Sequence, residues 1–279
     1  EGEVTLPPIS LKQRELKPEY SVQIASKAIL FFNYATHSST PADVMNKMVK
    51  TGQECFENVV TALNERYEKF CHMSGREYKA LPWKARTMSF DSLVSEVRKE
   101  VGDKLDDMIR SYAGEIMKDS RYDARDKTMK VVEYVHSLWS DKNPVLVVYL
   151  TPPYYPHIYV EGTRPKEKAL IDAVNYAVTT TSSDYKLMQK KFLPCISDLS
   201  YTAAPKEPEA IDALRQNMPG FGVIYDLPIE EMQALDLPVA DIGSYGKDAH
   251  QFTERVETVY SYEVLPEILY KTMMHILQQ

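Results

Sequence analysis

The run Leu237-Pro-Val-Ala-Asp-Ile242, followed by Gly243-Ser-Tyr-Gly-Lys-Asp-Ala-His-Gln-Phe-Thr-Glu-Arg255, decides the fold class of this chain. Five of its first six residues are apolar, which is typical of a strand buried on both faces in an α/β sheet. In open α/β sheets, ligands bind at loops beyond the carboxyl ends of the strands. His250 therefore lies where a catalytic or metal-binding group is expected. The glycines at 243 and 246 favour a tight loop, and Glu254 lies close enough in sequence to orient the imidazole.

The residues before and after this run alternate between strand and helix patterns. A second near-continuous apolar run, Val145 to Leu150, also predicts a strand buried on both faces. From residue 165 onward, the pattern predicts helices over 166–179, 208–217, 229–235 and 263–278, and strands over 192–196 and 237–242. Such alternation predicts an α/β sheet layer.

The first half of the chain is richer in helix patterns. A strand is predicted over Ala28 to Thr36, and the Thr40-Pro41 pair then predicts the start of a helix that runs to residue 73 and is stopped by Gly75. We expect one apolar stripe of this helix to lie in the core: Met45, Met48, Val49, Gly52, Phe56, Val59, Leu63, Tyr67 and Phe70. A short strand over 83–90 and a pair of helices over 91–118 and 123–140 are predicted next.

Composition excludes several classes of function. The chain has 279 residues, of which 44% are hydrophobic, so it can form one large domain or two smaller ones. A net charge of −7 provides no basic field for a nucleic acid, and the longest apolar runs are far too short to span a membrane. Three cysteines without CxxC spacing predict neither a disulfide framework nor a zinc knuckle, and they favour a reducing, cytoplasmic location. We interpret Glu1, which is not a methionine, as an internal cut.

Short catalytic motifs are missing, and each isolated candidate has a simpler explanation. The sequence has no GxGxxG, P-loop, HExxH or GxSxG motif. Spacing alone makes His250 a weak signal, because a single loop histidine is more often a surface residue than a ligand. Glu230 and Glu231 fit the first turn of a helix, where carboxylates are favourable. His37 fits a capping or exposed position, and Cys195 fits a small buried hydrophobic residue.

The run Pro238 to Val256 resembles the C-terminal signature of the aminoacylase and carboxypeptidase superfamily of co-catalytic zinc hydrolases. In that signature a strand enters a glycine-rich loop that ends in Ala-His, with Glu four residues later. Within the superfamily, the chain resembles arginine-utilisation proteins along its whole length. The matching blocks are Pro7-Pro-Ile-Ser-Leu-Lys-Gln13, Tyr20-Ser-Val-Gln23, Phe32-Asn33, Asn64-Glu-Arg-Tyr67, Leu81-Pro-Trp-Lys84 and Ile196-Ser-Asp198.

The resemblance implies an α/β fold that is only the C-terminal part of a metallohydrolase. Residues 1–90 would be the second half of a βαββαβ lid domain, 91–143 a helical insertion, and 144–279 the end of the catalytic domain. In the superfamily most metal ligands precede the lid, so the missing N-terminal half would supply them together with the catalytic groups. At the strand over 28–35 the chain shows Asn33-Tyr-Ala35 in place of the superfamily's Asp-x-Arg, so no lid arginine is carried over.

The resemblance also implies a set of site residues. His250 matches the last metal ligand, and zinc or another divalent metal pair would be completed by ligands upstream of Glu1. Asp198 and Ser200 match a stretch that contacts substrate. Glu254 and Asp248 would not bind the metal themselves but would support the His250 ligand from its outer side. The expected substrate is a small amide derived from an amino acid, and a homodimer is left open. No catalytic residue is expected in this chain itself.

Two other functions remain open. A non-catalytic relative with the same fold could act as a binding or regulatory protein, because a fold does not fix a function. An independent helical interaction domain would require the strand and helix pattern over 144–279 to be misassigned. The first alternative differs from the enzyme in the upstream sequence, where H-x-D, a bridging Asp and a Glu-Glu pair would be required for catalysis.

Overall fold

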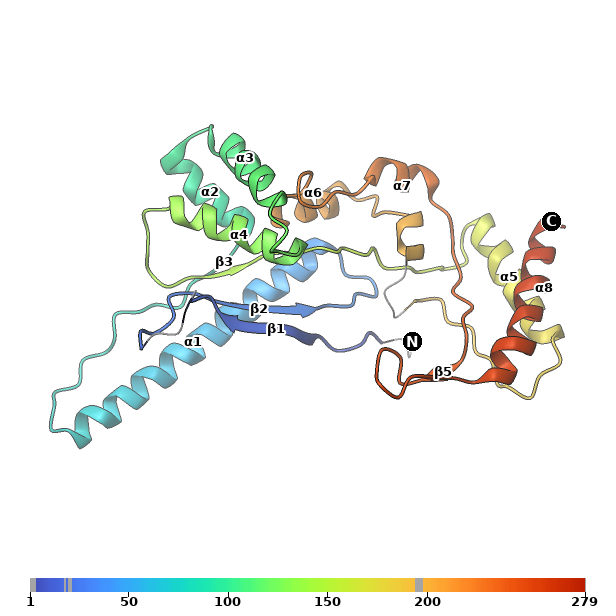
Figure 1. The fold of residues 1–279 in the computed structure, drawn as a ribbon, viewed down its shortest axis with the longest axis horizontal. Coiled ribbons are helices and arrows are strands. Elements are labelled where there is room, and N and C mark those ends of the chain that lie inside the picture. The colour runs from blue at the N-terminus through green and yellow to red at the C-terminus, as the bar shows by residue number, and fades with distance from the viewer. Residues whose placement is uncertain (1–3, 18, 20–21, 194–197, 279) are drawn as a thin grey trace. The chain divides into compact units, whose positions relative to one another are not determined.

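The computed structural model describes residues 4–17, 19, 22–193 and 198–278 (Figure 1). The chain is a mixed α/β protein, as predicted, and it divides into two compact units. Unit 1 contains Glu1–Ser38, Tyr155–Ala204 and Glu230–Gln279, and unit 2 contains Ser39–Tyr154 and Pro205–Ile229. The division into a half-lid, a helical insertion and a catalytic part stays a prediction. Among the described residues, no helix has both the length and the apolar character needed to cross a membrane.

Helix α1 (Pro41–Met73) of unit 2 begins and ends where the sequence predicts. The Thr40 hydroxyl accepts a hydrogen bond from the Asp43 amide at 3.2 Å, and the Asp43 carboxylate accepts one from the Thr40 amide at 2.9 Å. These reciprocal bonds form a capping box, which satisfies amide groups that the helix leaves unpaired. Gly75 follows the end of the helix with a φ of +64°, a conformation that favours glycine.

The expectation that the whole apolar stripe of α1 lies in the core is wrong. Of the stripe residues only Met45 is buried, and Val59 is 61% exposed. The helix packs against β3 (Thr87–Ser89), β4 (Leu146–Val148) and α6 (Pro208–Asn217), with Gly52 close to Thr87. A helix of 33 residues is about 50 Å long, which is more than these short elements can cover.

Strands β3 and β4 form a parallel pair in the register Thr87↔Leu146 to Ser89↔Val148. The strand predicted over 83–90 is therefore present, although shorter. The expectation of a strand buried on both faces over Val145 to Leu150 is wrong, because β4 has only three residues and Leu146 is 36% exposed. Among the described residues β4 pairs with β3 alone, so its other edge lacks the neighbour that such burial requires.

The main core of unit 2 lies among α2 (Phe90–Val101), α3 (Leu105–Met117) and α4 (Ala124–Leu138). A single helix predicted over 91–118 is in fact two, because Gly102 has a φ of +80° and ends α2. Helix α4 accounts for the second predicted helix. The fully buried side chains of these helices include Leu93, Val97, Leu105, Val131 and Val135.

Unit 1 begins with an antiparallel pair, β1 (Ile9–Glu15) and β2 (Ala28–Asn33). The pair contains an irregularity between Ser10 and Lys12. The predicted strand over 28–36 is present, but only its alternate residues Ile29 and Phe31 are buried. This alternation is typical of a strand with one covered face, and it differs from the fully buried strand that its apolar composition suggests.

Helices α5 (Pro165–Thr180) and α8 (Leu265–Leu277) lie side by side in unit 1 (Figure 1). A turn of π-helix over Tyr260–Val264 leads into α8, so the helix predicted over 263–278 is replaced at its start by a wider turn. Ala177, Tyr260, Val264 and Ile268 are buried between these elements. Helix α7 (Ile229–Leu235) and helix α6 coincide with their predicted ranges.

The predicted strand over 237–242 does not form. Leu237 donates a backbone hydrogen bond to the Thr202 carbonyl at 3.2 Å, but residues 238–244 have no hydrogen-bond partner among the described residues. The apolar sequence is that of a strand, and what is missing is a neighbouring strand. Phe192 of the other strand predicted in this region, 192–196, makes an isolated antiparallel bridge with Tyr159, and residues 194–197 lie outside the described part.

Candidate functional site

His250 lies in the loop of a small hairpin. Strand β5 (Gly246–Lys247) pairs antiparallel with β6 (Arg255–Val256), and the Glu257 amide donates to the Tyr245 carbonyl at 2.8 Å. A side chain at position 246 would not fit, because a Cβ atom there would lie 2.4 Å from the Arg255 carbonyl oxygen. Gly246 therefore permits the close approach of the two strands on which the loop is built.

The backbone of this loop is unusual at two positions that are not glycine. Asp248 has a φ of +58° and His250 a φ of +63°, both in the left-handed region. Residues with a Cβ rarely adopt this region, and they persist there only where surrounding contacts hold them. The tight conformations expected at Gly243 and Gly246 thus occur at Asp248 and His250 instead.

Two acidic side chains hold the loop in this shape. The Glu254 carboxylate accepts a hydrogen bond from the His250 backbone amide at 3.2 Å, and the Asp248 carboxylate accepts one from the Thr253 hydroxyl at 2.9 Å. Asp248 also forms an ion pair with Arg255. Glu254 therefore acts on the main chain of His250, whereas the sequence suggested a contact with the ring.

The imidazole of His250 is exposed, and it has no hydrogen-bond partner among the described residues. Within the described ranges, no three His, Cys, Asp or Glu side chains lie close enough together to hold a metal ion. Catalytic zinc sites usually take about three protein ligands. The residues present here do not fit a complete metal site, and His250 could supply one ligand to a site completed by other groups.

The proposed substrate contacts lie on a short 3-10 helix, η1 (Asp198–Thr202). Asp198 is exposed, whereas Ser200 is buried. The Tyr201 ring lies 5.2 Å from the Tyr155 ring, and desolvation, followed by the neighbouring Tyr201, raises the pKa of the Tyr155 hydroxyl. The bond from Leu237 to Thr202 ties η1 to the segment that leads to the His250 loop, so both features belong to one unit.

The other sequence candidates lie elsewhere. Glu230 and Glu231 occupy the exposed first turn of α7, in agreement with the simpler explanation of that pair. The His37 ring packs 4.6 Å from Phe192 and 5.2 Å from Tyr159, so His37 belongs to an aromatic cluster, and the residue that caps α1 is Thr40. Cys195 lies outside the described residues.

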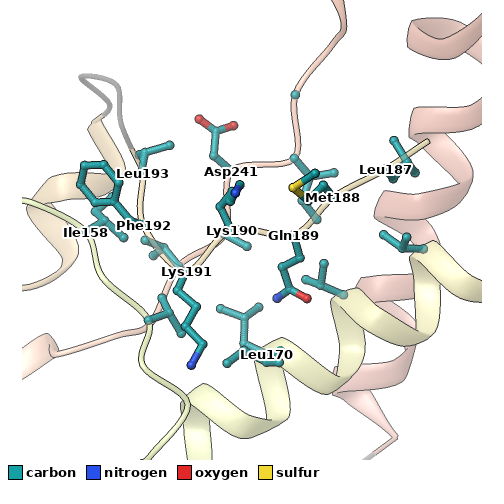
Figure 2. A pocket seen from close by; sticks show the side chains of 18 of the residues that line it. Ile158, Leu170, Leu187, Met188, Gln189, Lys190, Lys191, Phe192, Leu193 and Asp241 are labelled. Atoms are coloured by element: carbon teal, nitrogen blue, oxygen red, sulfur yellow. The ribbon is translucent and has the colours of Figure 1, made fainter. Parts of the chain in front are cut away.

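A cavity of about 360 Å³ in unit 1 had no signal in the sequence (Figure 2). Its apolar lining comes from α5, from Ile158 and Val160 on either side of the isolated bridge at Tyr159, and from residues 187–193. Residues 239–243, which precede the hairpin, form another part of the wall. Lys190 and Asp241 are charged and exposed lining residues. The cavity thus borders the chain segment that ends at the His250 loop.

The comparisons with known proteins agree with the full-length resemblance expected from the dispersed sequence blocks. The chain is 27% identical to Protein RocB of Bacillus subtilis (strain 168) over 280 residues, covering 100% of this chain and 49% of that protein. It is 30% identical to the uncharacterized protein YqjN of the same organism over 279 residues, covering 100% of this chain and 50% of that protein. The chain therefore spans about half the length of the curated relatives it matches. No family model and no solved structure matches it.

Proposed function

We propose that this chain is the C-terminal portion of a metal-dependent hydrolase of amide or peptide bonds, a deacylase or peptidase linked to arginine utilisation. One observation supports this function above the others. The β5–β6 hairpin presents the imidazole of His250, which has no hydrogen-bond partner in the described part of the chain, on a left-handed backbone that Glu254 and Asp248 hold in place. Backbone strain of this kind is concentrated at functional sites.

In this proposal each site residue has a distinct task. His250 supplies one nitrogen ligand to a zinc ion or another divalent metal pair, whose remaining ligands come from polypeptide outside this chain. Glu254 positions the loop through the His250 backbone amide, and Asp248 positions it through the side chains of Thr253 and Arg255. Asp198 and Ser200 contact a small amide derived from an amino acid. The similarity to Protein RocB along the whole chain supports the link to arginine utilisation that the sequence blocks suggest.

The test of the metal ligand is His250→Ala in the full-length gene product that carries this chain. We expect the bound metal per polypeptide to fall and the hydrolysis of a panel of N-acyl amino acids and dipeptides to be lost, because a ligand is removed from a site with few others. His72→Ala is the matched control, since His72 is an exposed histidine on α1 in the other unit. Metal content and hydrolysis equal to those of the control would refute the assignment.

The test of the substrate contacts is Asp198→Ala and Ser200→Ala in the same protein. We expect a change in KM or kcat with an unchanged metal content, because neither residue is a proposed ligand. Asp172→Asn, an exposed residue on α5, serves as the control. Kinetic constants equal to those of the control would show that these side chains only shape η1. Metal binding without hydrolysis of any panel member would favour the non-catalytic alternative.

A further inference from the structure

The cavity of unit 1 has the size and the lining of a small-molecule site. Its volume of about 360 Å³ lies within the roughly 300–1,000 Å³ that such sites occupy. Aliphatic side chains of two helices form part of its wall, among them Leu170 (Figure 2) and Val174 of α5 and Ile268 of α8. Protein interiors are otherwise close-packed, so side chains around an unfilled space lose attractive contacts. An apolar group of matching size would restore those contacts.

Tyr260 brings a polar group to this apolar wall. Its side chain lines the cavity and is only 7% exposed, yet its hydroxyl has no hydrogen-bond partner among the described residues. Burial also raises the pKa of this hydroxyl, so it stays neutral and can either donate or accept a hydrogen bond. Buried tyrosine hydroxyls usually have a partner. We therefore expect the partner of Tyr260 to come from a molecule in the cavity.

The backbone holds Tyr260 in this position through an uncommon turn. Tyr260 is the first residue of the π-helical turn that precedes α8, and its amide donates to the Glu257 carboxylate at 2.6 Å. Its ring also meets the Tyr185 ring edge-on, with the two centroids 5.3 Å apart. Turns of π-helix are rare, and many of them occur at functional sites. The turn thus supports a binding role for Tyr260 independently of the cavity.

Two oppositely charged side chains at the rim have no partner in the described part of the chain. Lys190 and Asp241 come from separate irregular segments, both are exposed, and in Figure 2 both lie across the cavity from Leu170. Neither has an ion pair or a hydrogen bond among the described residues. Lys191 differs, because its ammonium group donates to the Glu161 carbonyl at 2.9 Å. The rim thus offers one cation and one anion to a ligand.

These features together favour a zwitterion with a large side chain. A fatty acid would fill the apolar space but would leave Asp241 unpaired, and an apolar amine would leave Lys190 unpaired. A residue within a polypeptide carries neither backbone charge. A free amino acid supplies a carboxylate and an ammonium group together. Among amino acids with a large apolar side chain, tyrosine and tryptophan also carry a polar atom to which Tyr260 can bond.

We propose that the cavity is a binding site for a free aromatic amino acid of the tyrosine or tryptophan type. Its carboxylate lies near Lys190 and its ammonium group near Asp241, while its ring fills the apolar space and bonds to Tyr260. Residues 239–243 form part of the wall and run into the hairpin that carries His250, so an occupant would restrict the segment that leads to the candidate site. The proposal does not depend on the hydrolase function, because binding is measured without turnover.

The experiment is a calorimetric titration of the full-length gene product that carries this chain, with L-tryptophan as the probe. We expect saturable binding of one molecule per chain. Indole-3-propionate lacks the ammonium group and tryptamine lacks the carboxylate, so each should bind roughly tenfold more weakly. L-Alanine cannot fill the apolar space and should not bind. 1-Methyl-L-tryptophan lacks the indole N–H, so it should bind more weakly than L-tryptophan.

Three variants assign these contacts to residues. Lys190→Met should weaken L-tryptophan binding roughly tenfold and leave tryptamine binding unchanged. Asp241→Asn should weaken L-tryptophan binding and leave indole-3-propionate binding unchanged. Tyr260→Phe should lower the affinity for L-tryptophan to that for the 1-methyl compound, whose own affinity should not change. Lys186→Met is the matched control, since Lys186 is an exposed lysine of the same segment that does not line the cavity.

Two outcomes would overturn the proposal. Absence of L-tryptophan binding by the full-length protein would show that the cavity is not an amino-acid site there. Binding by Lys190→Met and Asp241→Asn that equals binding by Lys186→Met would place the bound molecule elsewhere. If Tyr260→Phe does not fold, the unsubstituted protein still tests the hydroxyl contact. Equal affinities for L-tryptophan and its 1-methyl derivative would then contradict a bond from the ring to Tyr260.

Discussion

The apolar side chains between α2, α3 and α4 are buried, whereas the pair α5 and α8 leaves large apolar side chains exposed to solvent. In the first group Leu93, Val97 and Val135 are fully buried by other residues of the same unit. In the second group α8 buries Ile268 against α5 but leaves Met273 56% exposed. A helix that is apolar on both sides needs a covering layer on each. The comparison teaches that α2, α3 and α4 are covered by other residues of this chain, while α8 carries more apolar surface than the described elements cover.

The largest expected effect is in the closed core. Leu93→Ala should lower the free energy of unfolding by about 2–5 kcal/mol, because it removes buried methyl groups and leaves a cavity. Met273→Ala on α8 should change the free energy of unfolding by less than about 0.5 kcal/mol. Urea unfolding of both variants measures the difference. Similar losses in the two variants would show that α8 is as well covered as α2.

The next effect concerns Glu167, a buried carboxylate in the first turn of α5. Burial acts to raise the pKa of Glu167, but hydrogen bonds from the Arg164 backbone and guanidinium outweigh it and the pKa is lowered. The same carboxylate accepts the Gly162 and Thr163 amides, each at 3.1 Å. Glu167→Gln should destabilise the chain by about 1.5–3 kcal/mol, because charged hydrogen bonds to a buried group are lost.

Thermal melting of Glu167→Gln is compared with that of Glu230→Gln, an exposed glutamate in the first turn of α7. The lowered pKa of Glu167 also sets the direction of its pH dependence. Its stabilisation is present above the unfolded pKa and is lost as the pH falls through the folded pKa. A melting temperature of Glu167→Gln equal to that of the control would show that the stability of α5 does not depend on the hydrogen bonds of the Glu167 carboxylate.

A smaller effect is expected at the edge of the closed core. The hydrogen bond from Arg86, followed by that from the Asn143 amide, lowers the pKa of Asp141 to about 2. The pair joins residues far apart in sequence, and Arg86 also lies over the Trp139 ring at 4.7 Å. Since the folded pKa is depressed, stability should fall as the pH drops from about 4 to about 2. Asp141→Asn should reduce that slope in acid unfolding curves.

Asp119 provides the matched control for this measurement. Its pKa is also lowered to about 2, but by Arg121, only two residues away. A pair between residues so close in sequence can also form in the unfolded chain. It then contributes little to the free-energy difference between the folded and unfolded states. Asp119→Asn should therefore change the acid slope less than Asp141→Asn. Equal changes would mean that the contact between Arg86 and Asp141 has no special role in joining distant parts of unit 2.

The smallest expected effect lies in the hairpin of unit 1. Glu254→Gln weakens the bond to the His250 amide, so this amide should exchange faster while the melting temperature stays unchanged. The exposed position of the loop accounts for the small effect on stability, which we expect to be within about 0.5 kcal/mol. Exchange of the His250 amide at the original rate would show that the turn itself holds the left-handed backbone.

Local signals in the sequence predicted the helices well. Thr40, Pro41 and Gly75 fixed both ends of α1, because caps and glycines act through neighbouring backbone groups. The break at Gly102 was missed, since a glycine inside a helical pattern does not always end a helix. The strand over 237–242 was predicted from its apolar residues, but a strand requires a partner, and none is available among the described residues.

The candidate site was predicted only in part. The resemblance selected His250, Asp248 and Glu254, and the structure places all three in one hairpin. The left-handed backbone of His250 could not be foreseen, because residues with a Cβ give no signal for it. The cavity that residues 239–243 help to line was also missed, since its walls come from separate stretches of apolar residues that have no common motif.

The close approach at Gly246 has a consequence for how this protein can change over generations. Every single-nucleotide change in a glycine codon that alters the residue introduces a side chain, and a Cβ atom here would lie 2.4 Å from the Arg255 carbonyl oxygen. No conservative exchange is therefore open to natural drift at this position. Among descendants that keep the hairpin, glycine should persist at 246 while the exposed residue Phe252 varies freely. Replacement of this glycine in a lineage would mark the loss of the loop that carries His250.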